Sequence, residues 1–120
     1  MPSTQQIAAR LAELCAQGEF ETAQKELFAD EAVSIEPRDT PDFSRETRGL
    51  RAIIDKGHKF ESMIEKMHGC TASTPLIAGN AFAITLAMDV TMKGRGRTKL
   101  EEVCVYQVKD GKIASEQFFM

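Results

Sequence analysis

The chain has 120 residues, a formal net charge of -3, 42% hydrophobic residues and 28% charged residues. This size predicts a single domain over residues 1–120 with its own hydrophobic core. The charge gives no field that would attract nucleic acid, and no stretch approaches the ~18 apolar residues of a membrane span. Because the N-terminus also lacks the apolar core of a signal peptide, we expect a cytoplasmic protein without nucleic-acid or membrane partners.

Two helices are predicted at the N-terminus. Ser3 and Gln6 have the spacing of a capping box, which would open the first helix, and Gly18 is placed to end it in a left-handed conformation. Apolar residues at helical spacing continue through a second helix from about Glu19 to Phe28.

A short strand is expected at residues 32–36, after a brief turn. It has the sequence AVSIE and ends at Glu36, directly before Pro37. Residues 37–48 then hold two prolines, many charges and one aromatic residue, Phe43, which is typical of a long surface loop that acts as a lid or binding segment. Glu36 could therefore be a pocket carboxylate, or a surface residue paired with an arginine of this loop.

A third helix is predicted from residue 50 to residue 68. Its apolar face has a helical period and comprises Leu50, Ile53, Ile54, Gly57, Phe60, Ile64 and Met67. Glu61 falls inside this face, which makes it a candidate pocket residue because buried carboxylates are rare unless they are paired or protonated.

A row of possible metal ligands runs along the same predicted helix. His58, Glu61, Glu65 and His68 could be drawn as a metal-binding row, but His-x-x-Glu spacing is a weak signal. The three cysteines have neither the even number of a disulfide framework nor the spacing of zinc ligands. We therefore predict no metal and no other cofactor.

The pattern changes to strand period from Gly69 onward. Strands are predicted within residues 70–79, 80–92, 99–108 and 112–120, and the Asp-Gly pair at 110–111 predicts a tight hairpin between the last two. Three helices followed by a β-meander predict an α+β fold, in which helices cover one face of a curved antiparallel (mixed) sheet.

The order of three segments, FADEAVSIEP, RGLRAI and DGKI, resembles the ketosteroid isomerase-like, or SnoaL-like, branch of the nuclear transport factor two-like superfamily. The resemblance covers essentially the whole chain. It implies a cone-shaped sheet around a deep apolar pocket, a hydrophobic small molecule as ligand, and a homodimer formed through the convex sheet face. The same scaffold hosts isomerases, cyclases, dehydratases and non-catalytic modules, so the fold alone does not imply one activity.

The resemblance places Glu36 at the position of the general base. Other positions depart from the ketosteroid isomerase pattern: the oxyanion tyrosine is Leu11, the two supporting tyrosines are Phe28 and Gly57, and the oxyanion aspartic acid is Cys104. A thiol is a weak donor and the other side chains donate nothing. We therefore expect no steroid isomerase activity by that mechanism.

Strand alternation extends the set of candidates. If Cys104 points inward, Glu102, Tyr106 and Glu116 do so as well, whereas the small apolar face around Thr85 and Val103 points outward as a dimer contact. Candidate proton donors or orienting groups are His58, Tyr106 and Glu116. The predicted pocket lining comprises Leu11, Phe28, Phe43, Gly57, Phe60, Glu61, Ile84, Leu86, Met88, Cys104 and Phe118.

These expectations favour a pocket protein that binds a hydrophobic molecule and, if catalytic, uses Glu36 as a general base for isomerisation, cyclisation or dehydration without a cofactor. The alternative is a non-catalytic ligand-binding or dimerisation module in which Glu36 only contacts the lid loop. A third possibility, water activation by Glu116 as in related epoxide hydrolases, lacks the arginine-bridged acid pair of that mechanism.

Overall fold

A mixed sheet and three helices make up the fold, and the computed structural model describes all residues 1–120. The elements are α1 (Thr4–Ala16), α2 (Phe20–Leu27), β1 (Phe28–Ile35), β2 (Glu46–Arg48), α3 (Leu50–Ser62), β3 (Ile64–Ala72), β4 (Leu76–Ala78), β5 (Ala81–Met92), β6 (Gly96–Lys109) and β7 (Lys112–Phe119). The sheet order is β2-β1-β7-β6-β5-β3, with β4 also paired to β5. Only β1 and β7 run parallel. The α+β prediction is confirmed.

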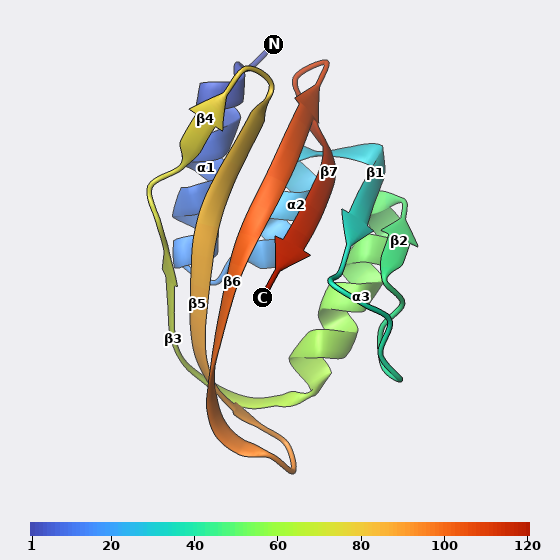
Figure 1. Cartoon of the computed structure of the whole chain (residues 1–120), viewed down its shortest axis with the longest axis vertical. Helices are drawn as coiled ribbons and strands as arrows, with labels where there is room; N and C mark the ends of the chain where they lie inside the picture. The colour runs from blue at the N-terminus through green and yellow to red at the C-terminus, as the bar shows by residue number, and fades with distance from the viewer.

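The curved sheet wraps around the helices. In Figure 1, α1 and α2 lie behind the long strands β5 and β6, while α3 lies beside β1 and β2 on the other side of the molecule. None of the helices combines the length and the hydropathy needed to cross a membrane.

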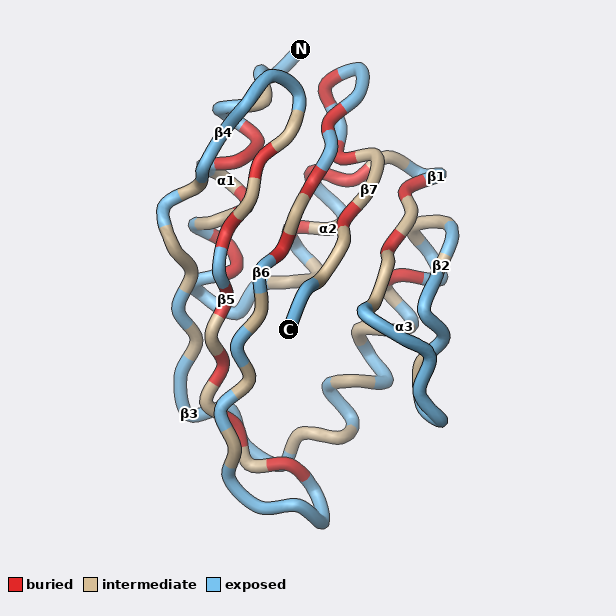
Figure 2. Tube along the Cα trace, in the orientation of Figure 1, coloured by how far each residue is buried: buried red, intermediate tan, exposed pale blue.

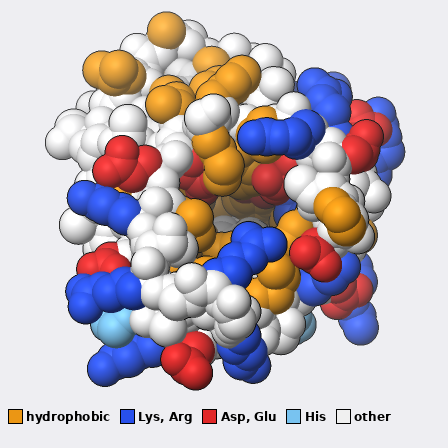
Figure 3. All heavy atoms as spheres, turned by 60° about the horizontal axis from the view of Figure 1, so that its bottom comes forward, with side chains coloured by type: hydrophobic (Ala, Val, Ile, Leu, Met, Phe, Trp, Pro, Cys, Tyr) orange, Lys and Arg blue, Asp and Glu red, His pale blue; other side chains and the backbone are white.

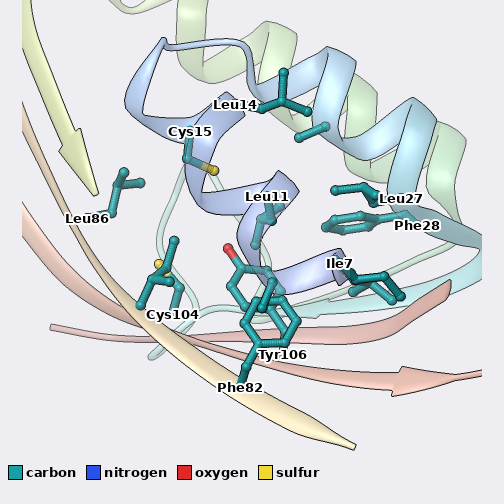
Figure 4. Packing of buried hydrophobic residues seen from close by; sticks show 14 of the residues in the cluster. Ile7, Leu11, Leu14, Cys15, Leu27, Phe28, Phe82, Leu86, Cys104 and Tyr106 are labelled. Atoms are coloured by element: carbon teal, nitrogen blue, oxygen red, sulfur yellow. The ribbon is translucent and has the colours of Figure 1, made fainter. Parts of the chain in front are cut away.

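The core lies between the N-terminal helices and the sheet. Ile7, Leu11 and Leu14 are buried residues of α1, and Leu11 points toward Tyr106 of β6 (Figure 4). The buried positions alternate along β5 and β6 with more exposed ones (Figure 2). Phe82 and Tyr106 stack there, with ring centroids 4.8 Å apart. Each fully buried side chain of this size contributes about 1.5–3 kcal/mol of hydrophobic stabilisation, so this contact fixes the sheet against α1.

Local signals at both ends of the chain have the predicted geometry. Ser3 and Gln6 form both hydrogen bonds of the capping box. Gly18 has φ +75°, as a left-handed cap requires. Asp110 and Gly111 also have positive φ values, 52° and 75°, and connect β6 to β7 as the predicted hairpin.

The predicted third helix is too long. α3 ends at Ser62, and Ile64 begins β3, which pairs with β5 as far as Ala72. The apolar spacing of Ile64 and Met67 continues the helical pattern, but hydrogen bonding to the edge of a long strand outweighs that local preference. Residues 64–68 therefore belong to the sheet.

The region around β1 also differs from the prediction. β1 begins at Phe28, directly at the end of α2, with no intervening turn. The predicted loop at 37–48 contains β2, which pairs antiparallel to β1. Most of that segment is exposed, including residues 37–42.

Candidate functional site

A hollow opens at the end of the molecule where α3, β3 and the β5–β6 hairpin converge. Figure 3 looks into this end and shows hydrophobic side chains inside the hollow, with acidic and basic side chains on its wall and rim. Phe60, Met63, Leu100 and Phe118 pack against the buried cluster but remain only partly buried. A small apolar molecule could occupy a hollow with hydrophobic side chains of this kind.

A continuous row of polar contacts joins four side chains of β1, the segment after it, α3 and β7. The Lys56 Nζ atom donates to Glu36 Oε2 at 2.8 Å and to Ser34 Oγ at 2.6 Å. The Ser34 hydroxyl in turn donates to Glu116 Oε2 at 2.7 Å. The Lys56 and Glu36 side chains are only 15% and 23% exposed, so their ion pair is screened much less than a surface pair.

The sheet and α3 bring these side chains together. Ser34 and Glu116 are direct partners in the parallel β1–β7 pairing, which sets their side chains side by side. Glu36 follows β1, and its backbone N–H donates to the Arg45 carbonyl at 2.6 Å. Lys56 lies on α3 one turn after the buried Ile53 and faces the sheet with it.

Two carboxyl groups at this site titrate near neutrality. Burial is the main reason that the pKa of Glu116 rises from 4.5 to about 7, against the opposing effects of the Ser34 hydrogen bond and the Lys56 charge. Burial, with the negative charge of Glu36, also raises the pKa of Glu102 to about 7. The Cys104 thiol donates weakly to Glu102 at 3.7 Å. Both groups can therefore hold or release a proton at neutral pH.

The candidate residues Glu36 and Glu116 thus belong to one hydrogen-bonded chain. Tyr106 is next to Glu116 in the sheet register, but its ring is buried on Phe82 and its hydroxyl points toward α1 (Figure 4). Burial raises the pKa of Tyr106 well above 10, so its phenol stays protonated.

Two predicted residues of α3 face away from this site. His58 is exposed and contacts Glu21 of α2 on the outer surface. Glu61, expected within the pocket wall, is exposed as well. With 3.6 residues per turn, a helix that turns Ile53 and Lys56 toward the sheet must turn His58 and Glu61 outward. The prediction that Glu61 lines the pocket is therefore wrong.

The other predicted lining residues divide by depth. Leu11, Phe28, Ile84, Leu86, Met88 and Cys104 are buried in the core, whereas Gly57, Phe60 and Phe118 are partly buried. Phe43 lies in the loop before β2, where the Lys59 ammonium sits 5.2 Å from its ring centroid. Most of the predicted lining therefore packs as core, and only the partly buried members remain near enough to the surface to meet a ligand.

The row of possible metal ligands does not exist in the folded chain. Glu65 and His68 lie on β3 rather than on the helix that carries His58 and Glu61. No group of three or more His, Cys, Asp or Glu side chains has a geometry that could hold a metal ion.

Comparison with known proteins assigns the chain to a family. The SnoaL-like domain family matches residues 2–120. The chain belongs to the SnoaL-like family. A Mesorhizobium loti protein of known structure, provisionally named a SnoaL-like polyketide cyclase and a carbohydrate phosphatase, is 31% identical, with 99% of this chain and 100% of that chain covered and a TM-score of 0.91. No curated protein matches the chain.

More distant structures share the fold of this SnoaL-like chain. A Burkholderia thailandensis protein described as nuclear transport factor two-like is 16% identical, with 99% and 91% coverage and a TM-score of 0.83. A Catenulispora acidiphila protein with a ketosteroid isomerase-like fold, solved in complex with trimethylamine, is 18% identical, with 98% and 87% coverage and a TM-score of 0.70. The predicted family and fold are thereby confirmed.

Sequence analysis did not identify Ser34 and Lys56, the two residues that connect Glu36 to Glu116 by hydrogen bonds in this SnoaL-like protein. Ser34 lies two residues before Glu36, so strand alternation already implied that the two share a face. Lys56 lies three residues after Ile53 and four before Phe60, within the apolar face of the helix. A charged residue at a core-facing position was the available signal.

Proposed function

We propose that this SnoaL-like protein is a cofactor-independent acid–base catalyst that transfers a proton on a hydrophobic small molecule bearing a carbonyl group. The outcome would be an isomerisation, cyclisation or dehydration. The observation that carries this proposal is the row of hydrogen bonds Glu36–Lys56–Ser34–Glu116, buried at Ser34 and Glu116 and partly buried at Lys56 and Glu36, with the Lys56 ammonium against the apolar ring of Phe118.

Glu36 acts as the general base in this proposal. Its carboxylate breaks a C–H bond next to the substrate carbonyl and takes the proton, while the electron pair passes to the carbonyl oxygen to form an enolate. Positioned acid–base groups typically accelerate such steps by about 10²–10⁴-fold.

Glu116 or Glu102 supplies the proton that completes the reaction. Because both have a pKa of about 7, a substantial fraction of each is protonated at neutral pH and can donate to the enolate. The name of the Mesorhizobium loti protein, a polyketide cyclase, supports a substrate with carbonyl groups.

Hydrogen–deuterium exchange on a probe ketone tests the proposal without knowledge of the natural substrate. In D₂O, the protein should accelerate exchange at the α-carbon of β-tetralone, followed by NMR. Glu36→Gln should lose roughly 10²-fold or more of that acceleration, with binding of the ketone retained.

Glu31→Gln, which changes an exposed carboxylate on β1, is the matched control and should exchange as the wild type does. Binding of the ketone without any acceleration by the wild-type protein would favour the non-catalytic alternative. Equal exchange by Glu36→Gln and the wild type would remove Glu36 as the base.

We also propose that two copies pair through the convex face of the sheet. On this face Val103 is 41% exposed and Phe119 is 49% exposed, and they are direct partners in the β6–β7 pairing. Small residues beside them, such as Thr85 and Ala83, would let a second sheet approach closely.

A cytoplasmic setting accords with the cysteines. Cys15, Cys70 and Cys104 are all free thiols, which persist in reducing compartments. Recovery of the native protein in the cytosolic fraction of its cells would support this setting, and recovery outside the cell would contradict it.

A further inference from the structure

We propose that Lys56 is the group that stabilises the negative charge developing on the substrate oxygen when Glu36 takes its proton. This inference rests on the proposed function and adds a catalytic residue to it. Lys56 would contact the carbonyl oxygen directly, through an N–H group that the protein itself leaves unused.

The hydrogen bonds of Lys56 leave room for this contact. An ammonium group has three N–H donors, and two of them are taken by Glu36 Oε2 and Ser34 Oγ. No third acceptor contacts the Nζ atom. The ammonium lies 5.6 Å from the centroid of the Phe118 ring, a partly buried residue at the edge of the core. The ammonium therefore has one N–H without a protein acceptor and lies against an apolar ring, and we place the ligand at this N–H.

The balance of charge makes the ion pair suited to proton abstraction. Before the reaction, the Lys56 cation neutralises the Glu36 carboxylate. Once Glu36 has taken the proton it is uncharged, and the negative charge resides on the enolate oxygen. Lys56 then neutralises the enolate. The negative charge thus passes from Glu36 to the substrate oxygen beside the same cation, and no new unpaired charge arises in a poorly solvated site.

Other groups near the base are poorer candidates for this role. The family positions of the oxyanion donors are occupied by Leu11 and Cys104, both buried. Tyr106 directs its hydroxyl toward α1, away from the ion pair. Glu116 and Glu102 become anionic as the pH rises and would then repel an enolate. Lys56 is the one cation in contact with Glu36.

The position of the ammonium is also fixed before any ligand binds. Ser34 accepts from Lys56 while donating to Glu116, so its hydroxyl hydrogen is directed away from the lysine. The Lys56 side chain is only 15% exposed, so the packing around its aliphatic part limits the alternative rotamers. A preorganised donor of this kind costs little reorganisation during the reaction.

Binding of a stable oxyanion tests this inference independently of turnover. The probe is a dinitrophenol that is ionised below neutral pH, where Glu102 and Glu116 are largely protonated. The matched uncharged probe is the dinitroanisole with the same ring. Glu36→Gln reproduces the uncharged base that exists after proton transfer, and therefore frees Lys56 to pair with the phenolate.

Dissociation constants are measured for the wild type, Glu36→Gln, Lys56→Met and the double variant. Lys56→Met should weaken phenolate binding by about 10-fold or more in the Glu36→Gln background, but by less in the wild-type background, where Glu36 competes for the ammonium. Lys56→Arg should retain part of the binding. The anisole should bind all variants within about 2-fold, since it carries no charge.

The double variant keeps the test valid if Lys56→Met alone is unstable, because it leaves no unpaired carboxylate at position 36. An equal effect of Lys56→Met in both backgrounds, no effect in the Glu36→Gln background, or no phenolate binding by any variant would overturn the inference. If the wild type accelerates α-carbon exchange but Lys56→Met does not weaken phenolate binding in the Glu36→Gln background, only the role of Lys56 is refuted. If Lys56→Met weakens phenolate binding but the wild type does not accelerate exchange, the proposed catalysis is refuted and Lys56 remains an anion-binding group.

Discussion

Glu116 holds a carboxyl group where ionisation is unfavourable. The residue is 5% exposed and its one hydrogen-bond donor is the Ser34 hydroxyl, while the nearest cation, Lys56, is shared with Glu36. A single lysine cannot neutralise three carboxylates, so the site retains protons at pH values where most glutamates have lost them. This shortage of cations links the chemistry of the site to the stability of the fold.

Stability should therefore fall as the pH rises. The pKa of Glu116 is 4.5 as a model value and about 7 in the folded protein, so the folded state holds more protons between these values. Its contribution is complete below pH 4.5 and is lost as the pH passes through 7. A pKa difference of this size corresponds to roughly 3 kcal/mol.

Urea unfolding from pH 4.5 to pH 8 measures this effect. Glu116→Gln should flatten the pH dependence and exceed the wild type in stability above about pH 7, because glutamine never ionises and can still accept from Ser34. Glu101→Gln, an exposed neighbour of Glu102 on β6, should retain the wild-type slope. A slope that Glu116→Gln leaves unchanged would contradict the assignment.

At the scale of single elements, α1 depends on its first turn. Ser3 Oγ accepts from the Gln6 backbone N–H at 3.1 Å, and Gln6 Oε1 accepts from the Ser3 N–H at 2.9 Å. These bonds satisfy donors that have no partner within the helix. The same helix supplies Ile7, Leu11 and Leu14 to the core, so fraying at its start weakens the contact with the sheet.

Ser3→Ala should lower the free energy of unfolding by about 1 kcal/mol, because the cap loses its side-chain acceptor. Thermal or urea unfolding followed by circular dichroism gives the measurement. Ser44→Ala, an exposed serine in the loop before β2, should change stability by less than about 0.5 kcal/mol. Equal stability of Ser3→Ala and the wild type would show that the capping box contributes nothing here.

The end of α3 shows what an element's own sequence does not determine. Ile64 and Met67 keep the helical spacing of Ile53 and Phe60, yet they pair with Met92 and Val90 of β5. The choice between helix and strand was decided by a partner some two dozen residues later in the chain. Glu65 and His68 therefore lie on β3, away from the helix that carries His58 and Glu61, and the four side chains do not form a row.

At the scale of the whole molecule, the convex sheet face is the surface with the composition of an interface. Val103 is paired with Thr85 on one side and Phe119 on the other, so exposed apolar atoms run across three neighbouring strands. Charged residues are absent from these three positions. A second copy would cover this surface with the symmetry that homodimers usually have.

If two copies pair through this face as proposed, Val103→Lys should give a folded monomer, because a charge in the centre of an apolar interface is costly to desolvate. Analytical ultracentrifugation gives the mass, and circular dichroism checks the fold. Ile77→Lys is the matched control: Ile77 is 43% exposed, similar to Val103, but pairs with Phe82 on the other side of the sheet. A monomeric wild type would contradict the proposed dimer.

The sequence by itself determined the features that depend on neighbouring residues. The Ser3–Gln6 cap, the left-handed Gly18, the Asp110–Gly111 hairpin and the two-residue alternation of β5 all arise from contacts or backbone preferences within a few residues. Their order along the chain was enough to indicate the fold. The family resemblance singled out Glu36 and strand alternation singled out Glu116, and in the folded protein Lys56 and Ser34 join the two by hydrogen bonds.

Only the tertiary structure decided which side chains make up the site. Lys56 reaches Glu36 across 20 residues of sequence, and Ser34 reaches Glu116 across 82. Such contacts depend on strand order and on the rotation of α3 about its axis. Helical periodicity places Lys56 at the edge of the apolar face, but it does not predict which carboxylate of the sheet the ammonium meets. Packing against the sheet resolves it, since only one rotation buries Ile53 and still pairs the charge of Lys56.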